Sequence, residues 1–112
     1  MNNDLTLPVE RQLEAYNKGD IDAYMASFAE DCVVEDGLGN VTMRGAEEMR
    51  DRYANLFSTY PNQHCEILSR TVVGNWVLDE ECITGRVEGE ETRCVAVYLV
   101  QDGLIRHIRF LR

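Results

Sequence analysis

Residues 92–111 read TRCVAVYLVQDGLIRHIRFL, and within them Asp102-Gly103 separates two apolar runs. Asp-Gly between apolar runs is a strong signal for a tight turn, because both positions tolerate a positive φ. The stretch therefore predicts two long antiparallel strands, Thr92–Gln101 and Leu104–Leu111, joined as a hairpin.

The strand pattern continues upstream of this hairpin. Two more apolar runs are bounded by short segments of turn residues, so the second half of the chain is predicted to be a meander. Long strands joined by short turns imply an antiparallel sheet. The two runs are His64–Val73 and Trp76–Val87, and the turn segments are Gly74-Asn75 and Glu88-Gly89-Glu90.

The first half of the chain has helical spacing. Apolar residues recur every three or four positions in three segments, which predicts three amphipathic helices. Gly19 is the left-handed stop of the first helix, and Asp20 caps the second. A short hairpin, 32–36 with 41–44, is predicted between the second and third helices. The three apolar stripes are Val9, Leu13 and Tyr16; Ile21, Tyr24, Met25 and Phe28; and Ala46, Met49, Tyr53, Leu56 and Phe57.

Helices followed by strands predict the α+β class. We expect three helices packed on one face of a curved antiparallel sheet, in a cone that encloses a pocket at its open end. The 112 residues fit a single domain over 1–112, since two domains would each be undersized.

The charge balance excludes several partners. Eleven Lys and Arg against twenty Asp and Glu give a net charge of −9. A chain this acidic is a poor ligand for nucleic acid and for an anionic membrane surface. No apolar run approaches the length of a membrane span, and residues 1–7 lack the pattern of a signal peptide. We therefore expect a cytoplasmic protein.

The four cysteines, Cys32, Cys65, Cys82 and Cys94, contain no CxxC pair. Zinc sites usually show tighter ligand pairs, and a chain without a secretion signal rarely forms disulfides. We expect reduced cysteines that pack as small apolar residues, with no metal and no cofactor.

Several local motifs together resemble the NTF2-like superfamily, and within it the ketosteroid isomerase and SnoaL-like polyketide cyclase group. The matching order covers nearly the whole chain, and the residue match is dense from 11 to 57. This fold hosts isomerases, cyclases, dehydratases, epoxide hydrolases and binding domains, so it does not define the activity. The motifs are Asn17-Lys18-Gly19-Asp20-Ile21-Asp22, Phe28-Ala29-Glu30-Asp31, Val34-Glu35-Asp36-Gly37, Arg44-Gly45, Tyr53-Ala54-Asn55 and Asp102-Gly103-Leu104-Ile105.

The resemblance implies that Asp36 is the acid–base residue. In the isomerases the matching aspartate moves a proton between two carbons of a steroid enone, which requires a carboxylate on a dry pocket wall. The alternative is that Asp36 begins the hairpin and accepts hydrogen bonds from turn N–H groups ahead of Gly37.

The family's oxyanion donors are altered here. The tyrosine of the first helix falls on Gln12, and the acid of the penultimate strand falls on Val97, which donates nothing. Tyr16 lies one turn after Gln12 and is a candidate donor, and Tyr53 matches a family tyrosine near the oxyanion site. Both tyrosines are alternatively core aromatics.

The predicted strand Trp76–Val87 contains Asp79 and Glu81 on one face. Alignment of the following hairpin with the family places these two carboxylates in the substrate pocket, where their pKa values would be shifted. A slip of one residue would turn both to solvent. The other expected pocket residues are Val97, Leu99, Ile108 and Phe110.

The sequence thus supports two main functions. The first is a cofactor-independent isomerase or cyclase that acts on a small hydrophobic carbonyl compound, with Asp36 as acid–base and Gln12, Tyr16 and Tyr53 near the oxyanion. The second is a non-catalytic module that binds a small molecule. A protein-interaction domain is a third reading. The resemblance also implies a homodimer through the outer sheet face, expected to include Cys94, Ala96 and Tyr98.

Overall fold

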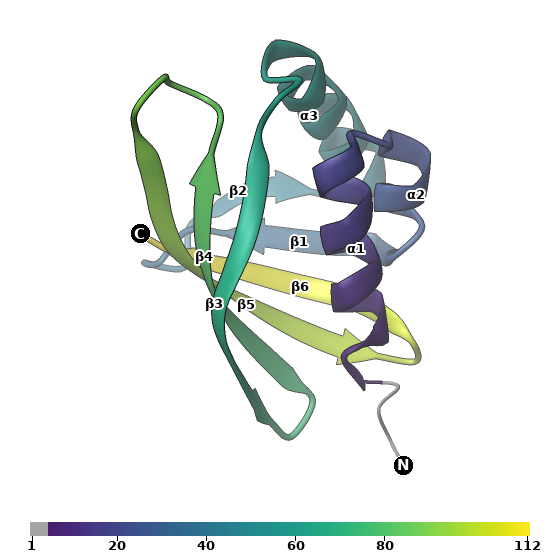
Figure 1. Cartoon of the computed structure of the whole chain (residues 1–112). Coiled ribbons are helices and arrows are strands. Elements are labelled where there is room, and N and C mark those ends of the chain that lie inside the picture. The colour runs from purple at the N-terminus through teal and green to yellow at the C-terminus, as the bar shows by residue number, and fades with distance from the viewer. Residues whose placement is uncertain (1–4) are drawn as a thin grey trace.

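The computed structural model describes residues 5–112, which form three helices and one six-stranded sheet (Figure 1). The chain has the cystatin-like, NTF2-like α+β architecture, with the sheet curved around the helices. In chain order the elements are α1 (Leu7–Lys18), α2 (Ile21–Met25), β1 (Phe28–Glu35), β2 (Val41–Arg44), α3 (Ala46–Thr59), β3 (His64–Val73), β4 (Trp76–Thr84), β5 (Glu91–Gln101) and β6 (Leu104–Leu111).

Local capping signals define the helix junction. Gly19 adopts a left-handed conformation with φ of 69° and ends α1. The side chain of Asp20 then accepts a hydrogen bond from the backbone N–H of Ala23 at 3.1 Å and begins α2. The stop at Gly19 and the cap at Asp20 that the sequence predicts therefore join the two helices by a tight turn.

The sheet has the strand order β2-β1-β6-β5-β4-β3. The only parallel pair within residues 5–112 is β1 with β6, and the other neighbours are antiparallel. The β5–β6 turn contains Asp102 and Gly103 with φ of 54° and 77°, as expected for Asp-Gly. Figure 1 shows β3, β4 and β5 crossing the direction of β1, so that the sheet bends around α1 and α3.

Two element boundaries differ from the sequence expectation. Phe28 lies in β1 and not on α2, because the carbonyl of Ser27 accepts a hydrogen bond from the N–H of Ile105 and draws the chain into the sheet. The strand β4 ends at Thr84, since Gly85 follows it with φ of 86°. In addition, α3 follows β2, so the three helices are not one N-terminal block.

The facing of β5 is the opposite of the expected one. Cys94, Ala96 and Tyr98 are buried toward the helices, whereas Val97 and Leu99 are half-buried on the outer face. Because side chains alternate along a strand, a shift of one residue exchanges the two faces. Cys94, Ala96 and Tyr98 were expected on the outer face of the sheet. Their neighbours along β5, which include Val97 and Leu99, form that face instead.

The core joins the helices to the inner face of the sheet. Its centre is an aromatic cluster of Tyr16, Tyr24, Phe28, Tyr53 and Phe57, whose neighbouring ring centroids lie 4.8–6.4 Å apart. All four cysteines are buried and unpaired, in agreement with the sequence prediction.

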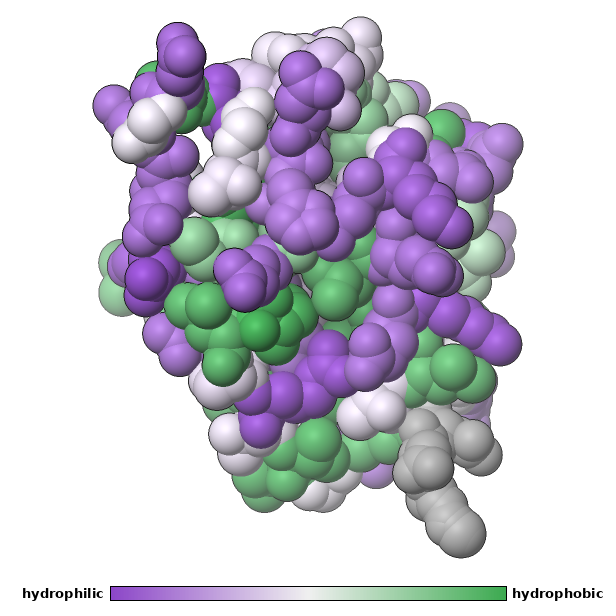
Figure 2. Space-filling model, in the orientation of Figure 1, coloured by the Kyte–Doolittle hydropathy of each residue, from purple (hydrophilic) through white to green (hydrophobic). Residues whose placement is uncertain are grey.

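The surface in Figure 2 is mostly polar over the helices, while apolar side chains gather at the end of the molecule where β3 turns into β4. Val72 and Val73 at this turn are 47% and 62% exposed. None of the helices within residues 5–112 combines the length and apolarity that a membrane-spanning helix needs.

Candidate functional site

A cavity of about 390 Å³ lies between the helices α1 and α3 and the inner face of the sheet. Aromatic, aliphatic and sulfur-containing side chains form much of its wall, together with a few polar and charged groups. The lining consists of Gln12, Leu13, Tyr16, Tyr24, Met43, Arg52, Tyr53, Asn55, Leu56, Thr59, Tyr60, Cys65, Glu81, Ile83, Arg86, Cys94, Tyr98, Phe110 and Arg112.

Glu81 is the carboxylate of this cavity. It projects inward from β4 and is 5% exposed. Its Oε2 accepts a hydrogen bond from the Tyr98 hydroxyl at 3.1 Å, and the Cys94 thiol lies 3.5 Å from Oε1. No cation within residues 5–112 forms an ion pair with it. Burial therefore raises the pKa of Glu81, and the bonds from Tyr98 and Cys94 oppose this only in part.

The Tyr98 hydroxyl connects Glu81 to the first helix. The Gln12 amide Nε2 donates to the Tyr98 hydroxyl oxygen at 3.2 Å and to the Val9 carbonyl at 3.0 Å. Burial raises the pKa of Tyr98 well above its ordinary value, so the phenol remains a neutral donor. A buried chain from Gln12 through Tyr98 thus fixes the orientation of the Glu81 carboxylate.

Asp79 is buried two residues before Glu81 but has a different partner. It is fully buried, and both of its oxygens accept hydrogen bonds from the Arg70 guanidinium at 2.6 and 2.9 Å. Arg70 also pairs with Glu10 at 2.6 Å. Asp79 is absent from the cavity lining. Its negative charge is therefore compensated within the fold.

A second polar group at the cavity joins α1 to the segment after β4. The Tyr16 hydroxyl donates to Gln63 Oε1 at 2.7 Å, and the Arg86 guanidinium donates to both the Tyr16 hydroxyl at 2.8 Å and Gln63 Oε1 at 3.0 Å. Burial raises the pKa of Tyr16, while Arg86 acts in the opposite direction.

Tyr53 lines the cavity from α3. Burial raises its pKa to about 12, and a hydrogen bond with Tyr24 reduces this shift. The phenol is therefore neutral across the physiological pH range. Gln12, Tyr16 and Tyr53, which the sequence grouped as oxyanion candidates, all lie on the wall of one cavity.

Asp36 lies in the β1–β2 turn and does not line the cavity. Its carboxylate accepts hydrogen bonds from the backbone N–H groups of Leu38 and Asn40, both at 2.9 Å, and from the Asn40 amide at 3.1 Å. These bonds lower the pKa of Asp36. Asp36 therefore accepts hydrogen bonds from turn N–H groups, which was the alternative hypothesis from the sequence. Its carboxylate does not lie on the cavity wall, where an acid–base residue was expected.

The remaining expected pocket residues are distributed over both faces of the sheet. Phe110 lines the cavity, and Ile108 is fully buried in the core without lining it. Val97 and Leu99 are on the outer face because of the shifted facing of β5. Tyr98 thereby occupies the inner position, so a hydroxyl donor is present where the sequence alignment had placed valine.

Sequence reasoning missed Tyr98, Arg86 and Gln63 as site residues. The inward position of Tyr98 depends on strand facing, and the Tyr16–Arg86 contact joins residues 70 positions apart. One sequence feature could have pointed to Arg86: it directly follows Gly85, at the end of β4. Within the part of the chain that the structure describes, no three His, Cys, Asp or Glu side chains are grouped to hold a metal ion.

Comparison with known proteins defines the family. A family model described as the SnoaL-like domain matches residues 9–108. The chain belongs to the SnoaL-like domain family. Its fold is that of the NTF2-like and cystatin-like proteins, which agrees with the resemblance in the sequence.

Several solved structures are similar to this chain over most of its length. An uncharacterised cystatin-fold protein from Novosphingobium aromaticivorans is 28% identical with a TM-score of 0.88, and all of both chains is covered. A protein from Sinorhizobium meliloti described as a "putative polyketide cyclase" is 25% identical with a TM-score of 0.79, covering 92% of each chain. An M. tuberculosis LEH-like epoxide hydrolase, 21% identical over 96% of this chain and 81% of its own, has a TM-score of 0.81 and shows the shared fold alone.

Proposed function

We propose that this SnoaL-like protein is a cofactor-independent enzyme of the isomerase or cyclase type, in which Glu81 moves a proton at a carbon next to a carbonyl group. The observation that carries the proposal is a 5% exposed carboxylate on a cavity wall with no cation as partner. A general base must meet its substrate in such a dry setting, where its pKa lies closer to the working pH.

The proposed step begins with Glu81 ionised. Its carboxylate takes the proton from the carbon, and the C–H electron pair moves into an enolate whose charge collects on the carbonyl oxygen. In an isomerase, Glu81 then returns the proton to a second carbon. In a cyclase, the enolate carbon instead attacks another carbonyl of the same molecule, and the proton passes to the new alkoxide.

The enolate oxygen needs a neutral hydrogen-bond donor. Gln12 donates to Val9 and Tyr98, and Tyr16 donates to Gln63, so these side chains already have acceptors. Tyr53 lines the same cavity from α3, and its hydroxyl is our candidate donor. A pKa of about 12 keeps it protonated throughout the cycle.

The cavity also limits the substrate. A volume of about 390 Å³ is within the range of small-molecule sites, and the wall formed by Leu13, Leu56, Ile83 and Phe110 favours a hydrophobic body. We propose that the substrate is a small carbonyl compound that the cone encloses when it is bound.

The test is exchange of α-protons in D₂O on a panel of neutral cyclic ketones and β,γ-enones of one to four rings, followed by ¹H NMR. We expect acceleration of at least one compound by more than about 100-fold over buffer. Glu81→Gln should return the rate to near the buffer value. The control, Glu80→Gln, changes the adjacent carboxylate, which contacts Ser69 on the other face of β4, and should retain the rate.

Asp36→Asn separates this proposal from the assignment of Asp36 as base. If Asp36→Asn removes exchange and Glu81→Gln does not, the role of Glu81 is overturned. If compounds bind but none exchanges faster than in buffer, the non-catalytic binding module is favoured. That alternative rests on the Gln12–Tyr98–Glu81 chain, which could instead orient a carboxyl group to recognise a ligand.

We also propose that two copies pair through the outer face of the sheet. In the observed facing, Leu78 lies opposite Val97 and Trp76 opposite Leu99 on that face. An apolar stripe of this kind is typical of an interface. Sedimentation at micromolar concentration should give a dimer, and Val97→Glu should give a monomer. A monomeric wild-type protein would contradict the pairing.

A further inference from the structure

The cavity and the whole chain have opposite charge. The chain carries a net charge of −9. Among the residues that line the cavity, however, three are arginines, Arg52, Arg86 and Arg112, and one is an acid, Glu81. A cavity wall that gathers positive charge in an acidic protein attracts an anion.

Arg86 is held in place by neutral groups, so its positive charge is not compensated by a carboxylate. Its Nε and one terminal nitrogen donate to Gln63 Oε1 and to the Tyr16 hydroxyl, and its guanidinium carbon lies 5.8 Å from the centre of the Tyr60 ring. All of these partners are neutral. No carboxylate within residues 5–112 forms an ion pair with Arg86, and its other N–H groups can be offered to a ligand.

Other arginines of the chain show the contrast. Arg70 is paired with Asp79, Arg106 with Asp31, and Arg109 with Glu35. These guanidinium charges are compensated by the protein itself.

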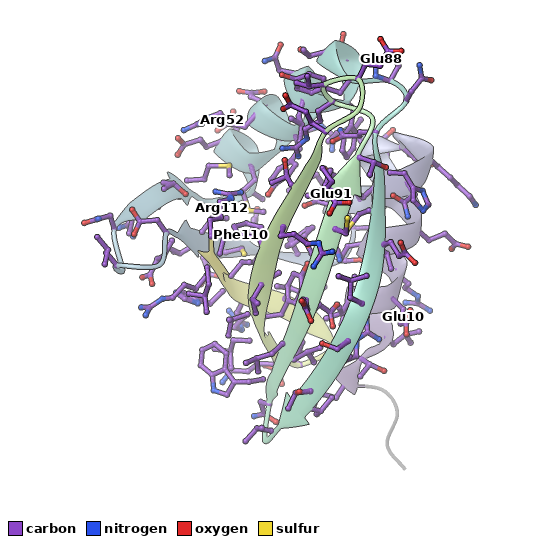
Figure 3. All side chains as sticks on the ribbon, turned by 60° about the vertical axis from the view of Figure 1, so that its left-hand side comes forward. Glu10, Arg52, Glu88, Glu91, Phe110 and Arg112 are labelled. Carbon is purple, nitrogen blue, oxygen red and sulfur yellow. The ribbon has the colours of Figure 1, made fainter. Side chains whose placement is uncertain are left out.

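The other two cavity arginines add to the field around Arg86. Arg112 has its guanidinium carbon 5.0 Å from the Phe110 ring centre. Arg52 donates to the Thr42 carbonyl at 3.0 Å and also forms an exposed ion pair with Glu48 at 3.8 Å. Figure 3 shows Arg52 on α3 and Arg112 beside Phe110 at the end of β6, on the same side of the molecule. The three arginines therefore come from three separate segments around one cavity.

We infer that the cavity takes a ligand with a carboxylate, which pairs with Arg86, and an apolar body that lies against the cavity wall. A planar guanidinium held by two hydrogen bonds presents its remaining N–H groups in a fixed geometry, which suits the two oxygens of a carboxylate. This inference deepens the proposed function, because it names the substrate as a carboxylate-bearing carbonyl compound.

The position of Arg86 is compatible with Glu81 acting on the same molecule. Glu81 lies within β4, whereas Arg86 follows the end of that strand, with the cavity residue Ile83 between them in the sequence. A ligand whose carboxylate pairs with Arg86 therefore keeps this charge at a different part of the cavity wall from the acid–base residue.

The test compares naphthalene-2-carboxylate with naphthalene-2-carboxamide by calorimetric titration of the full chain. We expect the carboxylate to bind at least tenfold more tightly than the carboxamide. Arg86→Gln should remove this preference while changing the carboxamide affinity by less than about threefold, and Arg86→Lys should retain part of it. The control Arg106→Gln, an arginine paired outside the cavity, should leave both affinities unchanged.

Equal affinity of the wild-type protein for the two probes, or a preference that survives Arg86→Gln, would overturn the inference. Salt provides a measurement that needs no variant: added NaCl should weaken carboxylate binding and spare the carboxamide. The α-proton exchange of neutral ketones tests the role of Glu81 separately. Equal affinity of the wild-type protein for the two probes, together with accelerated exchange of a neutral ketone, would thus overturn the ligand assignment alone.

Discussion

Asp79 and Glu81 are two carboxylates on the same face of β4, separated by one residue and both buried. Asp79 is held by the Arg70 guanidinium, while Glu81 accepts hydrogen bonds from the neutral Tyr98 hydroxyl and Cys94 thiol. Burial alone therefore does not define a functional acid. A buried acid with a cation partner contributes to the fold, whereas a buried acid on a cavity wall without a cation partner is a candidate for proton transfer.

The comparison is tested most strongly by removing the cation. In Arg70→Met, Asp79 would remain buried without its partner. We expect the free energy of unfolding to fall by about 3 kcal/mol, the cost of an uncompensated buried charge. Urea denaturation at pH 7 measures it. An effect below about 0.5 kcal/mol would show that the Arg70–Asp79 pair is not a structural element.

Neutralising the Glu81 carboxylate should have the opposite effect on the free energy of unfolding and should stabilise the protein at neutral pH. Its pKa is raised in the folded state, so folded protein binds more protons than the unfolded chain above about pH 4.3. The stability contributed by Glu81 is present below that pH and is lost as pH rises through the raised pKa.

Glu81→Gln should therefore gain stability relative to the wild-type protein as the pH increases from 4 to 8. Each unit by which the pKa is raised corresponds to about 1.4 kcal/mol. Thermal or urea unfolding across this range gives the difference, and Glu80→Gln, which changes the adjacent carboxylate on the other face of β4, is the matched control. A Glu81→Gln difference that is independent of pH would contradict the unpaired state of this carboxylate.

The smallest expected effect concerns the hydroxyl that supports Glu81. Tyr98→Phe removes the hydrogen bond to Oε2, which lowers the pKa of Glu81 in the wild-type protein. The variant should raise this pKa further and lose about 1 kcal/mol of stability. NMR of ¹³C-labelled glutamate follows the pKa directly. A decrease would mean that Tyr98 is not a donor to Glu81, and Tyr24→Phe, in the same cavity, serves as the control.

Local signals predicted much of the fold. Gly19 with Asp20, and Asp102 with Gly103, act within a few residues, and each has the expected conformation. Alternation also placed Asp79 and Glu81 on one face of their strand, while their inward direction was implied by the resemblance to the family. Because such features depend on residues adjacent in the sequence, a single sequence is enough to predict them.

The site depended on long-range facing and was predicted less well. A shift of one residue in β5 brings Tyr98 into the cavity and turns Val97 out. Arg86 becomes a site residue through contact with Tyr16 on α1, and Asp36 is held by the backbone of its own turn. Which of two adjacent residues faces inward is decided by packing across the sheet, and no local motif in β5 records it.

The pKa of Glu81 in the wild-type protein is the decisive measurement for an unpaired, buried acid on the cavity wall. Titration of the side-chain carboxyl ¹³C signal, assigned by its loss in Glu81→Gln, should give a value clearly above the ordinary value of about 4.3. The Asp36 carboxyl, titrated in a sample labelled at aspartate, should lie below its own ordinary value. A Glu81 pKa at or below 4.3 would contradict an unpaired, buried acid on the cavity wall.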